Sequence, residues 1–196
     1  MAQGQGIYSI SEAEGPLRQG EILSNLEQYN LVVSSIDDPT PQVAPKKHPW
    51  VIVLSQDCDL DQDFKQRFQK ASYPIKHFPL IPNILFCEVS EASKIRSSPG
   101  GEINAKIWTS IKQNNNIRYE FLEKIPPDKD FMGIEIPELV IDFKSFFTLP
   151  TEEVYAFLEK EKVKRHSGLN SPYLEHLTSR FFFYQSRVGE LLSNSV

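Results

Sequence analysis

The feature that most constrains the fold is an uninterrupted apolar run in the first third of the chain. Residues 50–54 read Trp-Val-Ile-Val-Leu, with three β-branched side chains at the centre. A strand with one face in water alternates apolar and polar residues, whereas an unbroken apolar run is typical of a strand buried on both faces. We therefore expect a strand here that is buried on both of its faces.

The other predicted elements set the fold class. Strands are expected at residues 20–33, where a polar stretch could divide one strand into two, and at 84–89, 117–122 and 139–143. Helices are expected at 60–68, 105–112, 151–164 and 172–192, the last with Ser171 as N-cap and Pro172 in its first turn. A strand-rich part thus precedes a helix-rich part. This order predicts an α+β fold built on a small barrel or a curled sheet.

Breakers divide the chain into three parts. The first 15 residues hold three glycines without an apolar period and are expected to be a flexible segment, and residues 34–49 hold four prolines and are expected to be a long loop. We expect a barrel-like core with an inserted helix at 16–150 and a C-terminal helical cap at 151–196. A chain of 196 residues suits one such domain.

Composition excludes several classes of protein. The two cysteines, Cys58 and Cys87, are too few for a disulfide framework or a four-cysteine zinc site. No apolar run approaches the length of a membrane span and the polar start is unlike a signal peptide, so we expect a cytoplasmic protein without membrane contact. The net charge of −5 argues against a protein that coats nucleic acid. No cofactor is expected.

The C-terminal helix carries two stripes. Its apolar stripe recurs at intervals of three and four and consists of Leu177, Phe181, Tyr184, Val188 and Leu191. Beside it lie His176, Arg180 and Arg187, which could form a solvated face, pair with carboxylates such as Asp57 and Asp59, or bind phosphate. Because Phe182 and Phe183 point away from the apolar stripe, we expect this helix to pack on two sides, against the core and a second copy in a homodimer.

A cysteine between two acids, Asp57-Cys58-Asp59, follows the buried strand. Flanking carboxylates disfavour a reactive thiolate, and the calcium-loop pattern lacks its glycine and glutamate. Magnesium bound by both aspartates is an alternative. We favour a structural turn in which an aspartate accepts hydrogen bonds from the backbone or from Arg180 and Arg187, while Cys58 fills a small apolar gap.

Other catalytic motifs are lacking. The four histidines, at positions 48, 77, 166 and 176, have no zinc-site spacing. A glycine-rich phosphate loop and a Gly-x-Ser-x-Gly elbow are both missing from the sequence, which counts against nucleotide hydrolysis and α/β-hydrolase chemistry.

Three short motifs between residues 19 and 90 resemble the MazF/PemK toxin family. They are Gln-Gly-Glu-Ile at 19–22, His-Pro followed by Val-Ile-Val-Leu-Ser at 48–55, and Leu-Phe-Cys-Glu-Val-Ser at 85–90. The Ser-Gln-Asp-Cys-Asp stretch at 55–59, with the C-terminal Pro-Tyr-Leu-Glu-His-Leu at 172–177, is also similar to a group of uncharacterised bacterial and phage proteins.

The toxin resemblance implies a small SH3-like barrel that dimerises, cleaves single-stranded RNA without a metal and is inhibited by an antitoxin. The arginine and the threonine or serine of that family's catalytic pair fall on His48 and Ser90, and His48 could act as general acid or base. Lys46 and Lys47 could bind the RNA phosphate. Two alternatives remain: a non-catalytic protein-interaction module, and a metal- or thiol-dependent enzyme centred on Asp57-Cys58-Asp59.

Overall fold

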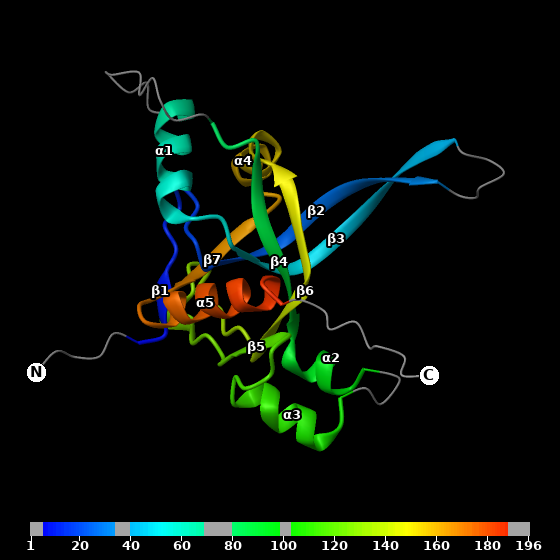
Figure 1. Ribbon diagram of the computed structural model, residues 1–196. Coiled ribbons are helices and arrows are strands. Elements are labelled where there is room, and N and C mark those ends of the chain that lie inside the picture. Colours follow the sequence, from blue (N-terminus) through cyan, green and yellow to red (C-terminus); the bar gives the residue numbers. More distant parts are fainter. Residues whose placement is uncertain (1–5, 34–39, 69–79, 99–102, 188–196) are drawn as a thin grey trace, which may run out of the picture.

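The structure is a computed structural model that describes residues 6–33, 40–68, 80–98 and 103–187 (Figure 1). The strands are β1 (Tyr8–Ile10), β2 (Glu21–Val33), β3 (Pro41–Val53), β4 (Asn83–Glu91), β5 (Tyr119–Leu122), β6 (Leu139–Pro150) and β7 (Lys164–Leu169). The α-helices are α1 (Asp57–Phe68), α2 (Ala92–Arg96), α3 (Ala105–Lys112), α4 (Thr151–Glu159) and α5 (Tyr173–Gln185), and a short 3-10 helix, η1, spans Pro127–Lys129.

One antiparallel sheet holds all seven of these strands, in the order β1-β7-β2-β3-β4-β6-β5. Together with the helices it confirms the α+β class. A barrel requires the two edge strands to pair with each other. Within the described residues β1 and β5 do not pair, so the sheet is not closed and the expected SH3-like barrel is not confirmed.

The unbroken apolar run lies at the centre of the sheet, as predicted. Val51, Ile52 and Val53 are all fully buried in β3. Because successive side chains of a strand point to opposite faces, Ile52 enters one hydrophobic cluster and Val51 and Val53 enter another. The described residues therefore form a core on each face of the sheet, and a third, smaller cluster joins Ala92 and Ile111 to β5 and β6.

Different helices cover the two faces (Figure 1). Leu177 of α5 packs into the cluster that contains Ile52, which we call the first core. Leu60 of α1 and Val154 of α4 pack into the cluster of Val51 and Val53, which we call the second core. The α1 and α3 predictions are confirmed, although α1 begins three residues earlier than expected, and α4 ends at Glu159 rather than near residue 164.

Two segments expected to lack regular structure are strands, so those predictions are wrong. The N-terminal segment contributes β1, and β7 lies between β1 and β2, where a helix end and a break at 167–170 were expected. The sequence of β7, Lys-Arg-His-Ser-Gly-Leu, lacks the apolar pattern of a strand, because most of its buried side chains are polar and contact buried partners. The presumed helical cap thus contributes a strand to the sheet.

Residues 41–49 of the proline-rich stretch form a strand rather than the expected loop, and residues 34–39 of that prediction lie outside the described residues. β3 begins at Pro41 and pairs with β2 from Val33↔Pro41 to Ile22↔Ile52, so β2 is one long strand without the expected division. Proline is tolerated in a strand where its nitrogen faces an edge. Beyond the body of the sheet, β2 and β3 continue as a two-stranded projection (Figure 1).

Helix α5 is largely as predicted. Leu177, Phe181 and Tyr184 of its apolar stripe pack against the first core, whereas Val188 and Leu191 lie outside the described residues. The helix begins at Tyr173 after Pro172, and Ser171 makes no capping bond to it. No helix in the described part of the chain is long and apolar enough to cross a membrane.

Candidate functional site

A groove of about 990 Å³ on the side of the second core is a candidate site for binding. Three elements give it an apolar wall: α1, α4 and the loop after η1. The apolar lining consists of Phe64, Phe68, Phe131, Met132, Tyr155, Ala156, Leu158 and Val163. Phe68, Phe131 and Met132 are 53%, 43% and 46% exposed, so the groove presents large apolar side chains at the surface. We call it the α1–α4 groove.

The aromatic wall of this groove is preorganised by ring packing. The rings of Phe64, Phe68 and Tyr155 contact one another, with centroids 5.0 to 5.6 Å apart. Phe64 and Phe68 lie one helical turn apart on α1, as their spacing predicted. Burial raises the pKa of the Tyr155 hydroxyl to about 12, so it stays neutral at physiological pH.

Charged side chains frame the groove, and acids predominate. Four carboxylates (Glu14, Glu152, Glu159 and Glu161) and three cations (Arg67, Lys164 and Arg165) line it. Arg67 donates to the buried Asp63 at 2.7 Å and to Glu152 of the rim at 2.8 Å, and Arg165 donates to the buried Glu21 at 2.6 and 2.9 Å. Lys164 lies 3.1 Å from Glu161, so the four rim carboxylates and the two buried ones face three cations. The groove therefore has an excess of negative charge at its rim.

The pair of Glu21 and Arg165 also fixes the segment that forms one rim of the groove. Arg165 donates to the carbonyl oxygens of Gly15 and Pro16, and Glu21 accepts from the backbone N–H of Arg18. The planar guanidinium suits such a set because its donors point in fixed directions. The buried pair thus orders residues 15–18 against β7 and holds the rim in place.

The structure places His48 inside the protein, at the base of the β2–β3 projection. Its side chain is 1% exposed and stacks on the ring of Phe147 with centroids 4.1 Å apart. Nδ1 lies 3.0 Å from Glu88, and Nε2 lies 3.1 Å from the Gln28 side chain. Burial lowers the pKa of His48, against the opposite pull of Glu88, so the ring favours its neutral form.

The other residues of the proposed ribonuclease site do not converge on an open pocket. Lys46 lies 2.5 Å from Glu88 and Lys47 lies 3.4 Å from Glu27, so each amine already has a carboxylate partner. Ser90 lies on β4, opposite Val140 of β6, and none of the contacts given for His48 in the described residues joins it to Ser90.

The Asp57-Cys58-Asp59 turn forms the start of α1. Asp57 accepts a hydrogen bond from the backbone N–H of Gln19 at 2.7 Å, so the predicted acceptor role falls on this aspartate. Cys58 is exposed, and the expectation that it fills an apolar gap is wrong. Among the described residues no three His, Cys, Asp or Glu side chains come close enough to hold a metal ion.

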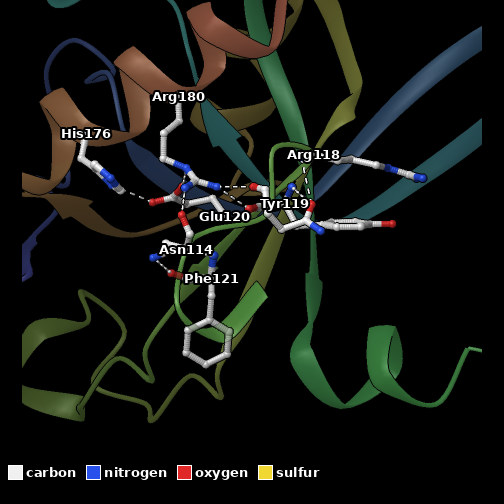
Figure 2. Close-up of polar contacts among 8 residues, drawn as sticks. Asn114, Arg118, Tyr119, Glu120, Phe121, His176 and Arg180 are labelled. Atoms are coloured by element: carbon white, nitrogen blue, oxygen red, sulfur yellow. Dashed lines mark hydrogen bonds and ion pairs between the residues drawn. The ribbon is translucent and has the colours of Figure 1, made fainter. Parts of the chain in front are cut away.

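Arg180 and His176 dock on β5 rather than on this turn, which corrects the expected pairing with Asp57 and Asp59. Figure 2 shows both side chains pointing from α5 toward Glu120, which is 4% exposed. Arg180 forms an ion pair with one oxygen of Glu120, and His176 Nδ1 lies 3.1 Å from the other. Burial raises the pKa of Glu120, while the two neighbouring cationic groups pull it down.

The Arg180 guanidinium also bonds to the edge of the sheet. It donates to the carbonyl oxygens of Asn114, Asn116 and Tyr119, which belong to the turn before β5 and to β5 itself (Figure 2). Arg187 instead stacks on Tyr184, 4.1 Å from the ring centroid, and is exposed. The basic stripe is thus divided between a structural anchor and a surface residue.

A second polar network, which the sequence did not reveal, connects β2, β7 and the loop after η1. Ser24 Oγ lies 2.8 Å from His166 Nε2, and His166 Nδ1 lies 2.7 Å from Asp130. An ionised carboxylate only accepts, so Nδ1 carries the proton and Nε2 accepts from the serine hydroxyl. The three residues are separated by 142 and 36 positions, which leaves no local motif to detect.

This network has the atom order of a Ser–His–Asp hydrolase site but lacks its access. The His166 side chain is 3% exposed, and the ring of Trp50 packs against it with centroids 4.9 Å apart. None of the three residues lines the α1–α4 groove. We interpret the network as a buried link between three chain segments.

Comparisons with known proteins do not identify a family for this chain, so its functional assignment depends on the geometry of the site. No protein-family model matches the chain, and no curated protein matches it. The resemblance to the MazF/PemK toxins therefore stays an expectation, and the α1–α4 groove is the candidate functional site that the fold itself presents.

Proposed function

We propose that the protein is a protein-interaction module whose α1–α4 groove binds an apolar, basic segment of a partner protein. The observation that carries this proposal is the groove itself: a volume of about 990 Å³ with a packed aromatic wall and exposed Phe68, Phe131 and Met132. Binding sites in proteins are typically concave and mostly apolar, with few polar groups that fix orientation. The alternative that the sequence left open, a non-catalytic module, is thus the one that the geometry favours.

The chemistry of the partner follows from the lining. Aromatic and aliphatic anchors would replace water against Phe64, Phe68 and Tyr155, which is where the binding free energy of interfaces concentrates. The excess carboxylates at the rim would attract lysine or arginine beside those anchors and repel acidic segments. The proposed partner segment therefore combines one or more large apolar residues with flanking positive charge.

Peptide selection tests this function and defines the chemistry of the partner segment in the same experiment. We expect random peptides of about a dozen residues, displayed and selected on the full chain, to converge on apolar anchors flanked by Lys or Arg. The selected peptide, synthesised with a fluorophore, should bind the wild-type protein in fluorescence polarisation. Phe68→Glu should weaken that binding by about tenfold or more, because it puts a charge on the apolar wall.

Phe182→Glu is the matched control. Phe182 is 74% exposed on α5, does not line the groove, and should give wild-type affinity when it is substituted. The proposal fails if selection yields no converging sequence, or if Phe68→Glu and Phe182→Glu affect the selected peptide equally.

A further inference from the structure

The projection of β2 and β3 beyond the sheet is a separate surface, which we call the arm (residues 26–33 and 41–48). β2 pairs with β7 only as far as Ser24↔Lys164, and β3 pairs with β4 only as far as Trp50↔Val89. Within the described residues the arm therefore contains two strands that pair only with each other (Figure 1). Two-stranded ribbons of this kind are marginal in water unless something covers them.

The two faces of the arm differ in polarity. Even-numbered residues form the more polar face, which reaches the body of the protein where Gln28 and Lys46 contact His48 and Glu88 respectively, although Val32 on this face is apolar and 45% exposed. Odd-numbered residues form the opposite face, where Glu27 contacts Lys47 and Tyr29 near the base of the arm. Farther out this odd face is apolar and exposed, at 49% for Tyr29, 75% for Leu31, 52% for Val33 and 65% for Val43.

The positions of two prolines show which backbone groups of the arm face outward. Pro41 and Pro45 both occupy odd positions of β3, and the β2–β3 register runs through each of them without a shift. Since proline has no N–H to donate, an intact ladder places it where the nitrogen faces away from the partner strand. Odd residues of the arm therefore point their backbone groups toward the free edges, and even residues form the ladder.

Asn25 provides independent support for this assignment. Leu23 and Leu26 both pack in the second core although a regular strand would place them on opposite faces. Asn25 lies between them with φ of 62°, a left-handed conformation that reverses the side of the strand to which the following side chains point. The face and the hydrogen-bonding direction of β2 therefore switch together at this residue, so that Leu26, unlike Ser24, directs its backbone toward β3.

The two edges of the arm are consequently unequal. The β3 edge lacks a donor at two of its outward positions, Pro41 and Pro45, and is protected as edge strands usually are. The β2 edge keeps both N–H and C=O at Glu27, Tyr29, Leu31 and Val33, and it contains no proline. From Tyr29 to Val33 it also carries no charged side chain.

We propose that the occupant of this edge is a second copy of the chain, joined through antiparallel pairing of the two β2 edges about a twofold axis near Leu31. Two identical strand edges can pair with each other in antiparallel orientation, because the outward-facing N–H and C=O groups of the odd residues in one copy then lie opposite those of the other copy. The neutral stretch from Tyr29 to Val33 brings no like charges together across the axis. The product is a four-stranded ribbon in which apolar side chains of the two arms contact across the new ladder.

Sedimentation velocity tests the dimer. In a reducing buffer, which excludes bridging by the exposed Cys58, the mass should rise with concentration from 22.5 kDa toward twice that value. Because a few residues per side make a small interface, we expect the transition at micromolar or higher concentration. Leu31→Pro should abolish it, since this change removes an outward donor of the β2 edge and leaves the β2–β3 ladder intact.

Val43→Pro is the matched control, because Val43 is paired with Leu31 on the opposite edge. It should dimerise as the wild type does, and circular dichroism should show both variants folded. If Leu31→Pro is unfolded, Leu31→Lys against Val43→Lys gives the same comparison. A monomer at all concentrations, or equal loss in both members of a pair, would overturn the proposal.

Hydrogen exchange supplies a second readout at the level of single amides. In the monomer the N–H groups of Gln28, Asn30 and Val32 should exchange slowly and those of Tyr29, Leu31 and Val33 quickly. In the dimer both sets should be slow. Protection that does not alternate, or does not change with concentration, would contradict the assigned edge.

Discussion

At the scale of single residues, burial decides the role of His48. A histidine that follows a proline-rich stretch and two lysines has the composition of a phosphate-binding site, and the toxin resemblance assigns it a catalytic role. In the folded chain the ring lies between Phe147, Gln28 and Glu88 and is held neutral. Its contacts are those of a packed side chain at the root of the arm.

This environment predicts a pH dependence of stability. The unfolded chain binds a proton on His48 near pH 6.5, whereas the folded chain does so only at lower pH, because burial lowers the pKa. Stability should therefore fall as the pH decreases through and below 6.5.

Urea denaturation of wild type and His48→Gln at pH values above and below 6.5 measures the effect. The variant should lose this part of the pH dependence. His176→Gln, at a position 53% exposed on its side chain, should keep it. Equal slopes in all three proteins would show that His48 does not titrate differently on folding.

The Asp57-Cys58-Asp59 turn shows how much a local sequence motif can predict about single residues. Two acids at a strand end indicated an acceptor of backbone hydrogen bonds, and Asp57 has this role toward Gln19. The motif could not indicate which cations would come near. Arg180 meets Glu120 because α5 crosses β5, and no spacing along the sequence encodes that crossing.

At the scale of elements, α5 is held by one arginine as well as by its apolar stripe. Leu177 is buried, while Phe182 and Phe183 are 74% and 59% exposed, so among the described residues the helix packs on one side. The expectation that both sides are covered therefore depends on contacts outside the described residues. Arg180 supplies the polar part of the docking through Glu120 and three backbone carbonyls.

We therefore expect Arg180→Met to destabilise the protein by about 2–4 kcal/mol, because it removes the ion-pair partner of the buried Glu120, which then keeps only His176, and the donor to three backbone carbonyls. Arg187→Met serves as the control. Arg187 is exposed and stacks on Tyr184, and its loss should cost less than about 1 kcal/mol. Urea denaturation compares the two free energies of unfolding, and equal values would refute the anchoring role.

Strands with a clear apolar pattern were predictable, and strands defined by their partners were not. β3 was recognised in its apolar half because Val51, Ile52 and Val53 need two buried faces. Its other half, from Pro41 to His48, can pair with β2 because Pro41 and Pro45 occupy positions whose backbone nitrogens face away from β2. Only the register of the two strands shows this. β7 is stabilised through Arg165 and His166, whose partners lie far away along the sequence.

At the scale of the whole molecule, the cationic groups that the toxin resemblance assigns to RNA do not form an open basic surface. Lys46 and Lys47 contact carboxylates, and His48 is enclosed. We therefore expect a long mixed RNA to remain intact when it is incubated in EDTA with an excess of the purified protein. Cleavage that disappears in His48→Ala would contradict this and support the toxin resemblance; gel electrophoresis is the readout.

The groove and the arm give the molecule two separate apolar surfaces. The groove lies over the second core, between α1 and α4, and the arm extends beyond the body (Figure 1). Substitutions in one should leave the other unaffected, since sites without shared contacts behave additively. Binding of a partner segment and pairing of two copies are therefore compatible in one assembly.

The sequence by itself determined the α+β class, the doubly buried central strand, most helices and the apolar stripe of α5. These properties depend on local periodicity, which the chain carries within one element. Only the tertiary structure decided the open sheet, the strand at β7, the partners of Arg180 and His48, and the outward edge of the arm. Each of these depends on which distant segments meet, and burial then fixes which polar groups can pair and which stay neutral.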